Sequence, residues 1–257
     1  MEVAGPAIDP ENTSKCSGSM RNPVRLRVAA CAALASLSPA HAIAAESGSG
    51  ITISGDATLV SDYRFRGLSL SGNDPALQGG ITIAHENGFY AGVWGSTIAD
   101  SALMGDIELD LIGGWTGELA TGTTADLSVT YYHYPRGRAS AGNSDYAEAV
   151  AKLDRTLGPV ETSAGIAYSW EQAAISGDNL YLFGDASADL PGTPLTLNAH
   201  VGRSSGSLAF EDHYVDWSAG IETSLGPVTA GVTYVDSDLA QDLGGGSAIV
   251  LSLGIGF

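Results

Sequence analysis

Carboxylates recur at alternate positions in several apolar stretches of this 257-residue sequence. In the segment IELDL, for example, Glu108 and Asp110 alternate with aliphatic residues. A row of carboxylates on one face attracts cations and repels anions, although it can equally serve only to solvate a polar face. The acids at such polar positions are Asp56, Glu108, Asp110, Asp126, Glu148, Glu161, Asp216 and Glu222.

Basic side chains at the same polar positions are few. Arg64 and Arg66 occur in the segment SDYRFRG, and Lys152 lies four residues after Glu148. A guanidinium can form two parallel hydrogen bonds to a carboxylate, so these arginines can pair with the acids. Two roles remain open for them: a constriction that selects solutes, or a structural pair that closes the fold or pins a loop.

Enzymatic and nucleic-acid chemistry find little support. His133 and His200 lie in segments of alternating polarity, but no motif joins either to a nucleophile. No His/Asp pair has the spacing of metal ligands. The net charge of −18 argues against nucleic acid as a partner, because phosphate binding needs a basic surface. We therefore expect no catalytic centre, cofactor or metal.

The amino-terminal part has the features of a targeting segment. Met20 opens an arginine-rich stretch, an apolar stretch follows at 28–37, and an Ala-x-Ala cleavage signal ends it. These features predict a secretory signal peptide at 20–42, preceded at 1–19 by an extension from a misassigned start. Both cysteines fall in the removed part, so the mature chain, 43–257, should lack disulfides. It keeps 7 basic and 26 acidic residues.

The mature chain consists of segments of about ten residues that alternate apolar and polar side chains, which is the period of a two-faced strand. No break in composition divides them, which indicates one domain. The alternation is weak in the second, third and eighth segments, so their facing stays open. The predicted strands are 51–63, 77–86, 88–98, 106–116, 125–134, 146–157, 160–170, 179–188, 195–203, 214–225, 228–235 and 247–257.

Strand length favours a transmembrane barrel over a soluble sandwich. Ten residues at about 3.3 Å each, tilted by about 45°, span close to the ~25 Å apolar band of such barrels, whereas sandwich strands are shorter. An even strand count puts both termini on one side. Short turns also alternate with longer glycine-rich connections, which are predicted at 64–75, 99–105, 135–145, 171–178, 204–213 and 236–246.

The sequence ends in SAIVLSLGIGF, an apolar stripe with Phe257 as its last residue. In an up-and-down antiparallel β-barrel this stripe faces lipid, and Phe257 sits in the aromatic girdle at the interface. The ending also resembles the terminal signature of bacterial outer-membrane proteins. That resemblance implies that the barrel-assembly machinery is a partner and that Phe257 is part of the signal it reads.

The stretch 61–96 resembles the signature region of the TorF-type porins, the proteins with a Gcw_chp domain. Weaker matches follow in DIELDLIGGW, YYHYPRG and DYAEAVAKL. The resemblance implies an outer-membrane barrel. The matching positions of the stretch are Tyr63, Arg64, Phe65, Arg66, Gly67, Pro75, Ala76, Leu77, Gln78, Gly79, Gly80, Gly88, Phe89, Tyr90, Ala91, Gly92 and Trp94.

We therefore expect a channel in the bacterial outer membrane for small cations or polar neutral solutes, with membrane lipid and an unidentified solute as partners. The eight acids above, with Arg64, Arg66 and Lys152, are the pore-lining candidates. Glycine-rich strands favour space inside. The alternative is a plugged structural or adhesive barrel without transport, and a barrel hydrolase is not favoured.

Overall fold

The computed structural model describes residues 45–47, 50–210 and 212–257. The predicted signal peptide, 20–42, and the extension before it lie outside the described residues. Among the described residues, no helix has the length and apolar character needed to cross a membrane.

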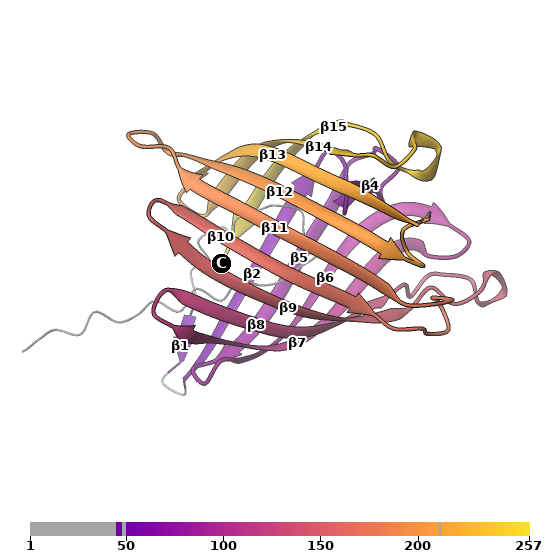
Figure 1. Cartoon of the computed structure of the whole chain (residues 1–257), viewed down its shortest axis with the longest axis horizontal. Coiled ribbons are helices and arrows are strands. Elements are labelled where there is room, and N and C mark those ends of the chain that lie inside the picture. Colours follow the sequence, from indigo (N-terminus) through magenta and orange to yellow (C-terminus); the bar gives the residue numbers. More distant parts are fainter. Residues whose placement is uncertain (1–44, 48–49, 211) are drawn as a thin grey trace, which may run out of the picture.

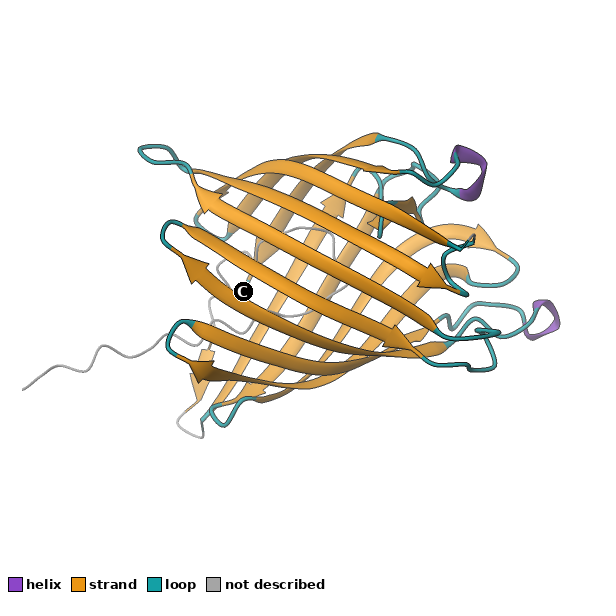
Figure 2. Cartoon of the chain, in the orientation of Figure 1, coloured by secondary structure: helices purple, strands orange, loops and turns teal. Residues whose placement is uncertain are grey.

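Twelve long strands form one closed antiparallel barrel (Figures 1 and 2). Each strand pairs with the next in the chain, and β15 pairs with β2 to close the circle. The barrel strands are β2 (Ile51–Val60), β5 (Ala76–His85), β6 (Phe89–Ser101), β7 (Gly105–Ala120), β8 (Thr123–His133), β9 (Tyr146–Leu157), β10 (Val160–Ser169), β11 (Asn179–Asp189), β12 (Leu195–Gly206), β13 (His213–Leu225), β14 (Val228–Ser237) and β15 (Ala248–Gly256).

Five short elements complete the fold. β1 (Ala45–Ser47) pairs with the start of β2, and β3 (Arg64–Phe65) pairs with β4 (Leu68–Ser69) in a small separate hairpin. Two 3-10 turns, η1 (Ala139–Ala141) and η2 (Gln241–Leu243), lie in connections between barrel strands.

The twelve predicted strands are confirmed, but one predicted connection is wrong. The backbone continues as β6 to Ser101 and resumes as β7 at Gly105, so the long connection expected at 99–105 shrinks to 102–104. A register shift between Thr97 and Ser101 lets the two strands stay paired beyond the expected turn.

The two ends of the barrel differ in their connections. One end, called here the turn end, carries the short connections together with β1 and Phe257 (left in Figure 1). The opposite end, the loop end, carries the longer connections. This arrangement confirms that both ends of the barrel sequence lie on one side.

Side-chain facing is inverted relative to a soluble protein. Large aliphatic side chains such as Leu59, Ile83 and Leu253 lie about half exposed on the outer surface, while carboxylates such as Asp110 are fully buried inside. This is the arrangement expected of a barrel surrounded by lipid, where charge on the outer face is destabilising. The facing that the sequence left open is also settled, because Gln78, Trp94 and Tyr181 are buried on the inward side of β5, β6 and β11.

The aromatic girdles have polar partners at the loop end. Tyr131, Tyr168 and Tyr234 face outward, and their hydroxyls donate to Asp145, Asp178 and Asp236 over 3.3, 2.6 and 2.6 Å. Each ring therefore has an apolar body against the barrel surface and a polar tip at the rim, as interfacial aromatic residues require.

Phe257 closes the seam between the last and first barrel strands. Its backbone exchanges hydrogen bonds of 2.8 and 2.9 Å with Gly55 of β2. A Cβ atom at Gly55 would lie 2.7 Å from the Phe257 ring, so the ring lies flat over the glycine. The terminal aromatic residue thus covers the end of the β2–β15 seam on the outer face.

Candidate functional site within the barrel

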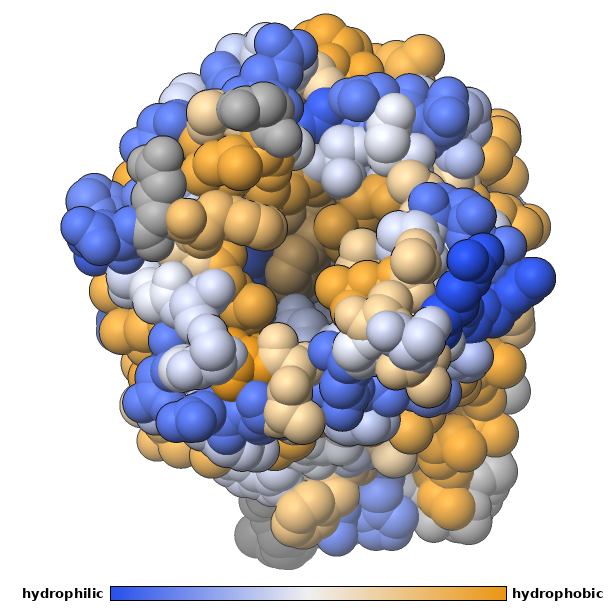
Figure 3. All heavy atoms as spheres, turned by 90° about the vertical axis from the view of Figure 1, so that its right-hand side faces the viewer, coloured by the Kyte–Doolittle hydropathy of each residue, from blue (hydrophilic) through white to orange (hydrophobic). Residues whose placement is uncertain are grey.

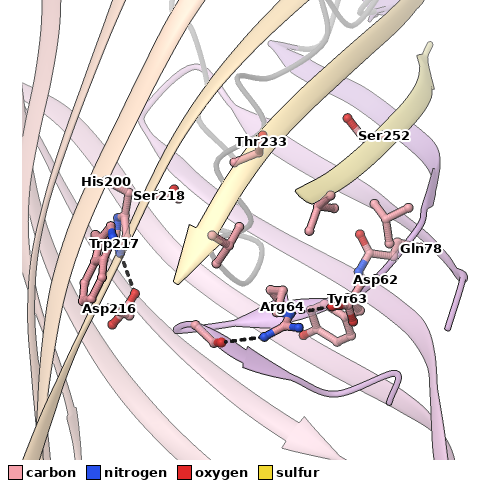
Figure 4. Close-up of a pocket in the computed structure, with 14 residues that line it drawn as sticks. Asp62, Tyr63, Arg64, Gln78, His200, Asp216, Trp217, Ser218, Thr233 and Ser252 are labelled. Atoms are coloured by element: carbon pink, nitrogen blue, oxygen red, sulfur yellow. Dashed lines mark hydrogen bonds and ion pairs between the residues drawn. The ribbon is translucent and has the colours of Figure 1, made fainter. Parts of the chain in front are cut away.

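The residues after β2 turn back into the barrel as the β3–β4 hairpin (Figure 4). Arg66 and Gly67 form its tip, with φ angles of 50° and 81°, and two-residue hairpin turns of type I′ need positive φ at both positions. A Cβ atom at Gly67 would lie 2.9 Å from the Cβ atoms of Asp216 and Ser237. The tip therefore reaches across the lumen to β13 and β14.

Arg64 fixes the base of the hairpin. Its Nε donates to Asp62 over 2.5 Å, and its Nη2 donates to Asn73 over 2.7 Å. Its Nη1 donates to the carbonyl oxygens of Gly67 and Gly246 over 3.1 and 3.0 Å. All of these partners except Gly246 lie in the same connection as Arg64. Of the two roles considered for this arginine, a constriction or a structural pair, its contacts are those of a residue that pins a loop.

Arg66 instead reaches across the lumen to the opposite wall. Its Nη2 donates to Glu148 of β9 over 2.5 Å, and both side chains are buried. Its guanidinium lies 4.1 Å from the ring centre of Tyr181 and 4.7 Å from that of Phe65, within the range of cation–π attraction. Tyr132 also donates to Glu148, over 3.3 Å. Arg66 is thus held by a carboxylate and aromatic rings.

Two further carboxylates lie beside this ion pair, on β7. Glu108 accepts a hydrogen bond from Tyr134 over 3.0 Å. Asp110 is flanked in register by Trp94 of β6 and Tyr132 of β8, and it is 0% exposed. Neither Asp110 oxygen has a hydrogen-bond partner among the described residues. We call Glu108, Asp110 and Glu148 the acid cluster.

A second polar network joins β11, β12 and β13. His200 Nδ1 lies 2.6 Å from Asp185, and its Nε2 lies 3.1 Å from Asp216. Tyr181 Oη lies 2.8 Å from His200 Nε2 and 3.1 Å from each Asp216 oxygen. The His200 imidazole of β12 thus bridges carboxylates of the two neighbouring strands, β11 and β13.

The remaining predicted acids lie at inward positions closer to the turn end. Asp126 accepts from Tyr90 over 2.8 Å and stands directly opposite Lys152, whose Nζ lies 3.1 Å from Asp154. Glu222 is buried on β13. The other two, Asp56 and Glu161, are exposed. The structure therefore gathers only Glu108, Asp110, Glu148 and Arg66 into one cluster and spreads the other candidates along the lumen.

Several inward glycines on the strands from β5 to β12 make room for aromatic rings rather than for solvent. A Cβ at Gly114 would lie 2.5 Å from Tyr90, and one at Gly202 would lie 1.9 Å from the Tyr181 hydroxyl. The expectation that glycine-rich strands leave space inside is therefore wrong at these positions. The aromatic ring of a neighbouring strand fills the space that each of these two glycines leaves.

A small cavity, of about 50 Å³, lies between the hairpin and the strands β12 to β15, β2 and β5 (Figure 4). Its size admits a few water molecules. Figure 3 looks onto the loop end and shows a hollow at its centre. The inward polar side chains that border the cavity are Gln78, His200, Asp216, Ser218, Thr233 and Ser252.

The lumen therefore has two unlike sides. The packed wall, formed by β6 to β11, carries the acid cluster and its aromatic side chains. The open wall, formed by β12 to β15 with β2 and β5, carries mostly small polar side chains and borders the cavity. In the part of the chain that the structure describes, no three His, Cys, Asp or Glu side chains are placed to hold a metal ion.

A family model described as "Bacterial protein of unknown function (Gcw_chp)" matches residues 44–250. The chain belongs to the Gcw_chp family. This match confirms the family resemblance that the stretch 61–96 indicates. No curated protein matches the sequence.

Solved porin structures share the architecture of this Gcw_chp barrel. The NanC porin superimposes with a TM-score of 0.54 at 12% identity, over 80% of this chain and 98% of that one. The KdgM porin, solved in complex with disordered oligogalacturonate, gives 0.53 at 6% identity, over 80% and 97%. At such low identity the likeness establishes the fold, which is that of outer-membrane porins.

Sequence reasoning missed the partners of the predicted residues. Asp185, Tyr181 and His200 meet only because β11, β12 and β13 pair in one particular register. The eighth predicted strand alternates too weakly to reveal its facing from the sequence. Two signals were present, the shared inward parity of His200 and Asn198, and Gly67, since glycine is a common turn residue.

Proposed function

We propose that this protein is an outer-membrane channel that conducts small cations and polar neutral solutes. The observation that carries the proposal is the excess of carboxylates on the inward face of a barrel whose outer face is apolar. Surrounding lipid would account for the outer face, and a water-filled passage would account for the inner one.

The basic side chains of the lumen are fewer than its acids, and each is engaged by one acid. Arg64 bonds Asp62, Arg66 bonds Glu148, and Lys152 bonds Asp154. The field of the other acids then acts on a passing ion, and a low-dielectric wall focuses it. Anions should be repelled and cations concentrated.

The open wall supports a passage beside the hairpin. Its inward side chains are short, and the cavity lies between them and Arg64. A twelve-stranded barrel also has a diameter between those of the filled eight-stranded barrels and the wide 16-stranded porins. Such a passage would be narrow, and a few side chains would set its selectivity. KdgM was solved with a polyanion, which the acidic lumen of this protein should exclude.

A reversal potential tests the proposal directly. Purified protein in a planar bilayer is placed under a potassium chloride gradient at low salt, where screening is weak. We expect a potential of the sign that marks cation preference, and a smaller one after neutralising Glu108 and Asp110 together. The matched control neutralises Asp145 and Asp178, which lie in the loop-end connections. Anion preference in the unmodified protein would reject the acidic-lumen argument.

A plugged barrel is the second candidate function, and the hairpin favours it. The hairpin spans the lumen and is held at its base by Arg64 and at its tip by Arg66. The cavity beside it admits only a few water molecules. If reconstituted protein is folded but shows no current, a structural or adhesive role replaces the channel.

We also propose that Phe257 and the strand before it engage the barrel-assembly machinery. The ring lies over Gly55 at the seam where the barrel must close. Deleting Phe257 should lower the amount of heat-modifiable barrel in the outer membrane, while the conductance of the channels that do form stays unchanged. Normal levels of folded barrel after the deletion would count against the proposal.

A further inference from the structure

We propose that the pocket now filled by the Arg66 side chain is a binding site for small organic cations that carry a guanidinium or primary ammonium group. Arg66 would be a tethered occupant that these solutes replace. The inference rests on the proposed channel function and names the class of solute that the channel would select.

The pocket has the chemistry that recognises an organic cation. Glu148 supplies a buried carboxylate, already oriented by hydrogen bonds from Tyr132 and from Ser169, the latter over 3.1 Å. Tyr181 supplies an aromatic face 4.1 Å from the guanidinium carbon. A desolvated carboxylate beside an aromatic face favours organic cations, because the ring attracts the charge and packs against the apolar part.

Arg66 satisfies this pocket incompletely. Its hydrogen bond to Glu148 uses one Nη2 donor, and its buried Nε has no hydrogen-bond partner among the described residues. The hairpin tip, with Arg66 at φ 50°, limits how the side chain can approach Glu148. A free guanidinium has no such restraint and can present two parallel donors to the carboxylate.

The acid cluster has more carboxyl groups than basic partners. Arg66 bonds Glu148, and Glu108 bonds the neutral hydroxyl of Tyr134. Asp110 is fully buried, and both of its oxygens lack a hydrogen-bond partner. A buried carboxylate in that state is costly unless a cation or donor reaches it. Asp110 is therefore the second anchor of the site.

The site adjoins the cavity beside the hairpin. The cavity reaches Gly67 and Asp216, and Asp216 accepts a hydrogen bond from the hydroxyl of Tyr181, whose ring lies against Arg66. Withdrawal of the Arg66 side chain would join the pocket to the cavity. A solute passing along the open wall would then meet Glu148 and Tyr181.

Chemical rescue tests the inference. In Arg66→Gly the pocket loses its occupant, and glycine accepts the positive φ of this position. We expect the unfolding temperature of the purified barrel, read from its heat-dependent gel mobility, to fall, and 5 mM guanidinium chloride to restore part of the loss. The same concentration of sodium chloride should not. Arg138→Gly, which removes an exposed loop arginine, and Arg66→Gly/Glu148→Gln should show no guanidinium effect.

Current block gives a second readout. A tethered group competes at an effective concentration in the millimolar range, so half-block of potassium current by guanidinium should need on the order of tenfold less in Arg66→Gly than in the unmodified protein. Arg66→Lys keeps the charge but not the planar fork, so its half-block concentration should lie between those of Arg66→Gly and the unmodified protein. If Arg66→Gly does not fold, Arg66→Lys takes its place in this test.

The outcomes separate this inference from the channel proposal. Cation current without guanidinium rescue or enhanced block overturns the binding site and leaves the channel standing. Rescue without any current supports the site and rejects the channel. Equal effects of guanidinium and sodium on every variant reject the site.

Discussion

The packed wall and the open wall are built on the same strand pattern, yet one is filled and the other is not. Both alternate apolar outward positions with polar inward positions. The difference lies in the size of the inward side chains. Tyr132, Tyr181 and Trp94 fill the packed wall, whereas Ser218, Thr233 and Ser252 leave the open wall bordering a cavity. Periodicity therefore sets the barrel, and the volume of the inward side chains sets which part of its lumen is left unfilled.

The two walls also differ in how their charges are held. The packed wall buries Glu148 against Arg66 and leaves Asp110 without a hydrogen-bond partner. At the edge of the open wall, Asp216 is shared by His200 and Tyr181. Ionisable groups that are buried this tightly strongly affect the free energy of unfolding, and the effect can be stabilising or destabilising. Substitutions on the packed wall should therefore change stability far more than those on the open wall.

The largest expected effect is at Glu148. Glu148→Gln leaves the Arg66 guanidinium buried without its carboxylate, which costs about 3–5 kcal/mol in comparable buried pairs. The midpoint of urea unfolding in detergent should fall accordingly. Glu161→Gln, which removes an exposed acid from the neighbouring strand β10, is the matched control and should change it little. Similar losses in the two variants would remove the distinction between buried and exposed acids.

Substitution of Asp110 should change stability in the opposite direction. Its buried oxygens lack hydrogen-bond partners, so replacement by the near-isosteric leucine removes a desolvated polar group and should stabilise the barrel by about 1–3 kcal/mol. Cation preference should fall in the same variant. Asp56→Leu, at an exposed inward position, should not stabilise. Destabilisation by Asp110→Leu would show that the carboxylate is already satisfied.

The smallest effect is expected on the open wall. Ser252→Ala and Thr233→Ala remove hydroxyls that border the cavity, so the unfolding free energy should change by less than about 0.5 kcal/mol. Their effect should appear instead in conductance, because these side chains line the proposed passage. A loss of stability comparable to that of Glu148→Gln would mean that the open wall is packed as tightly as the other.

The sequence predicts the barrel because the strand period, the turn chemistry and the apolar final stripe are local signals. The ion pair between Arg66 and Glu148 is not local, since the two residues are 82 positions apart. It depends on a hairpin that folds inward and on the register of several strand pairs. Gly114 misleads for the same reason, because the ring that occupies its space, that of Tyr90, belongs to a neighbouring strand.

Cysteine accessibility tests the central claim, that solutes pass along the open wall and not through the packed wall. Both native cysteines, Cys16 and Cys31, precede the first strand of the barrel, so the barrel itself offers a background without thiols. Ser252→Cys lies on the open wall, and Ser128→Cys, at a buried inward position of β8 away from the Glu148 pocket, lies on the packed wall. A cationic thiol reagent should block current through Ser252→Cys within minutes and leave Ser128→Cys unaffected. Rapid block of Ser128→Cys with none of Ser252→Cys would contradict the account.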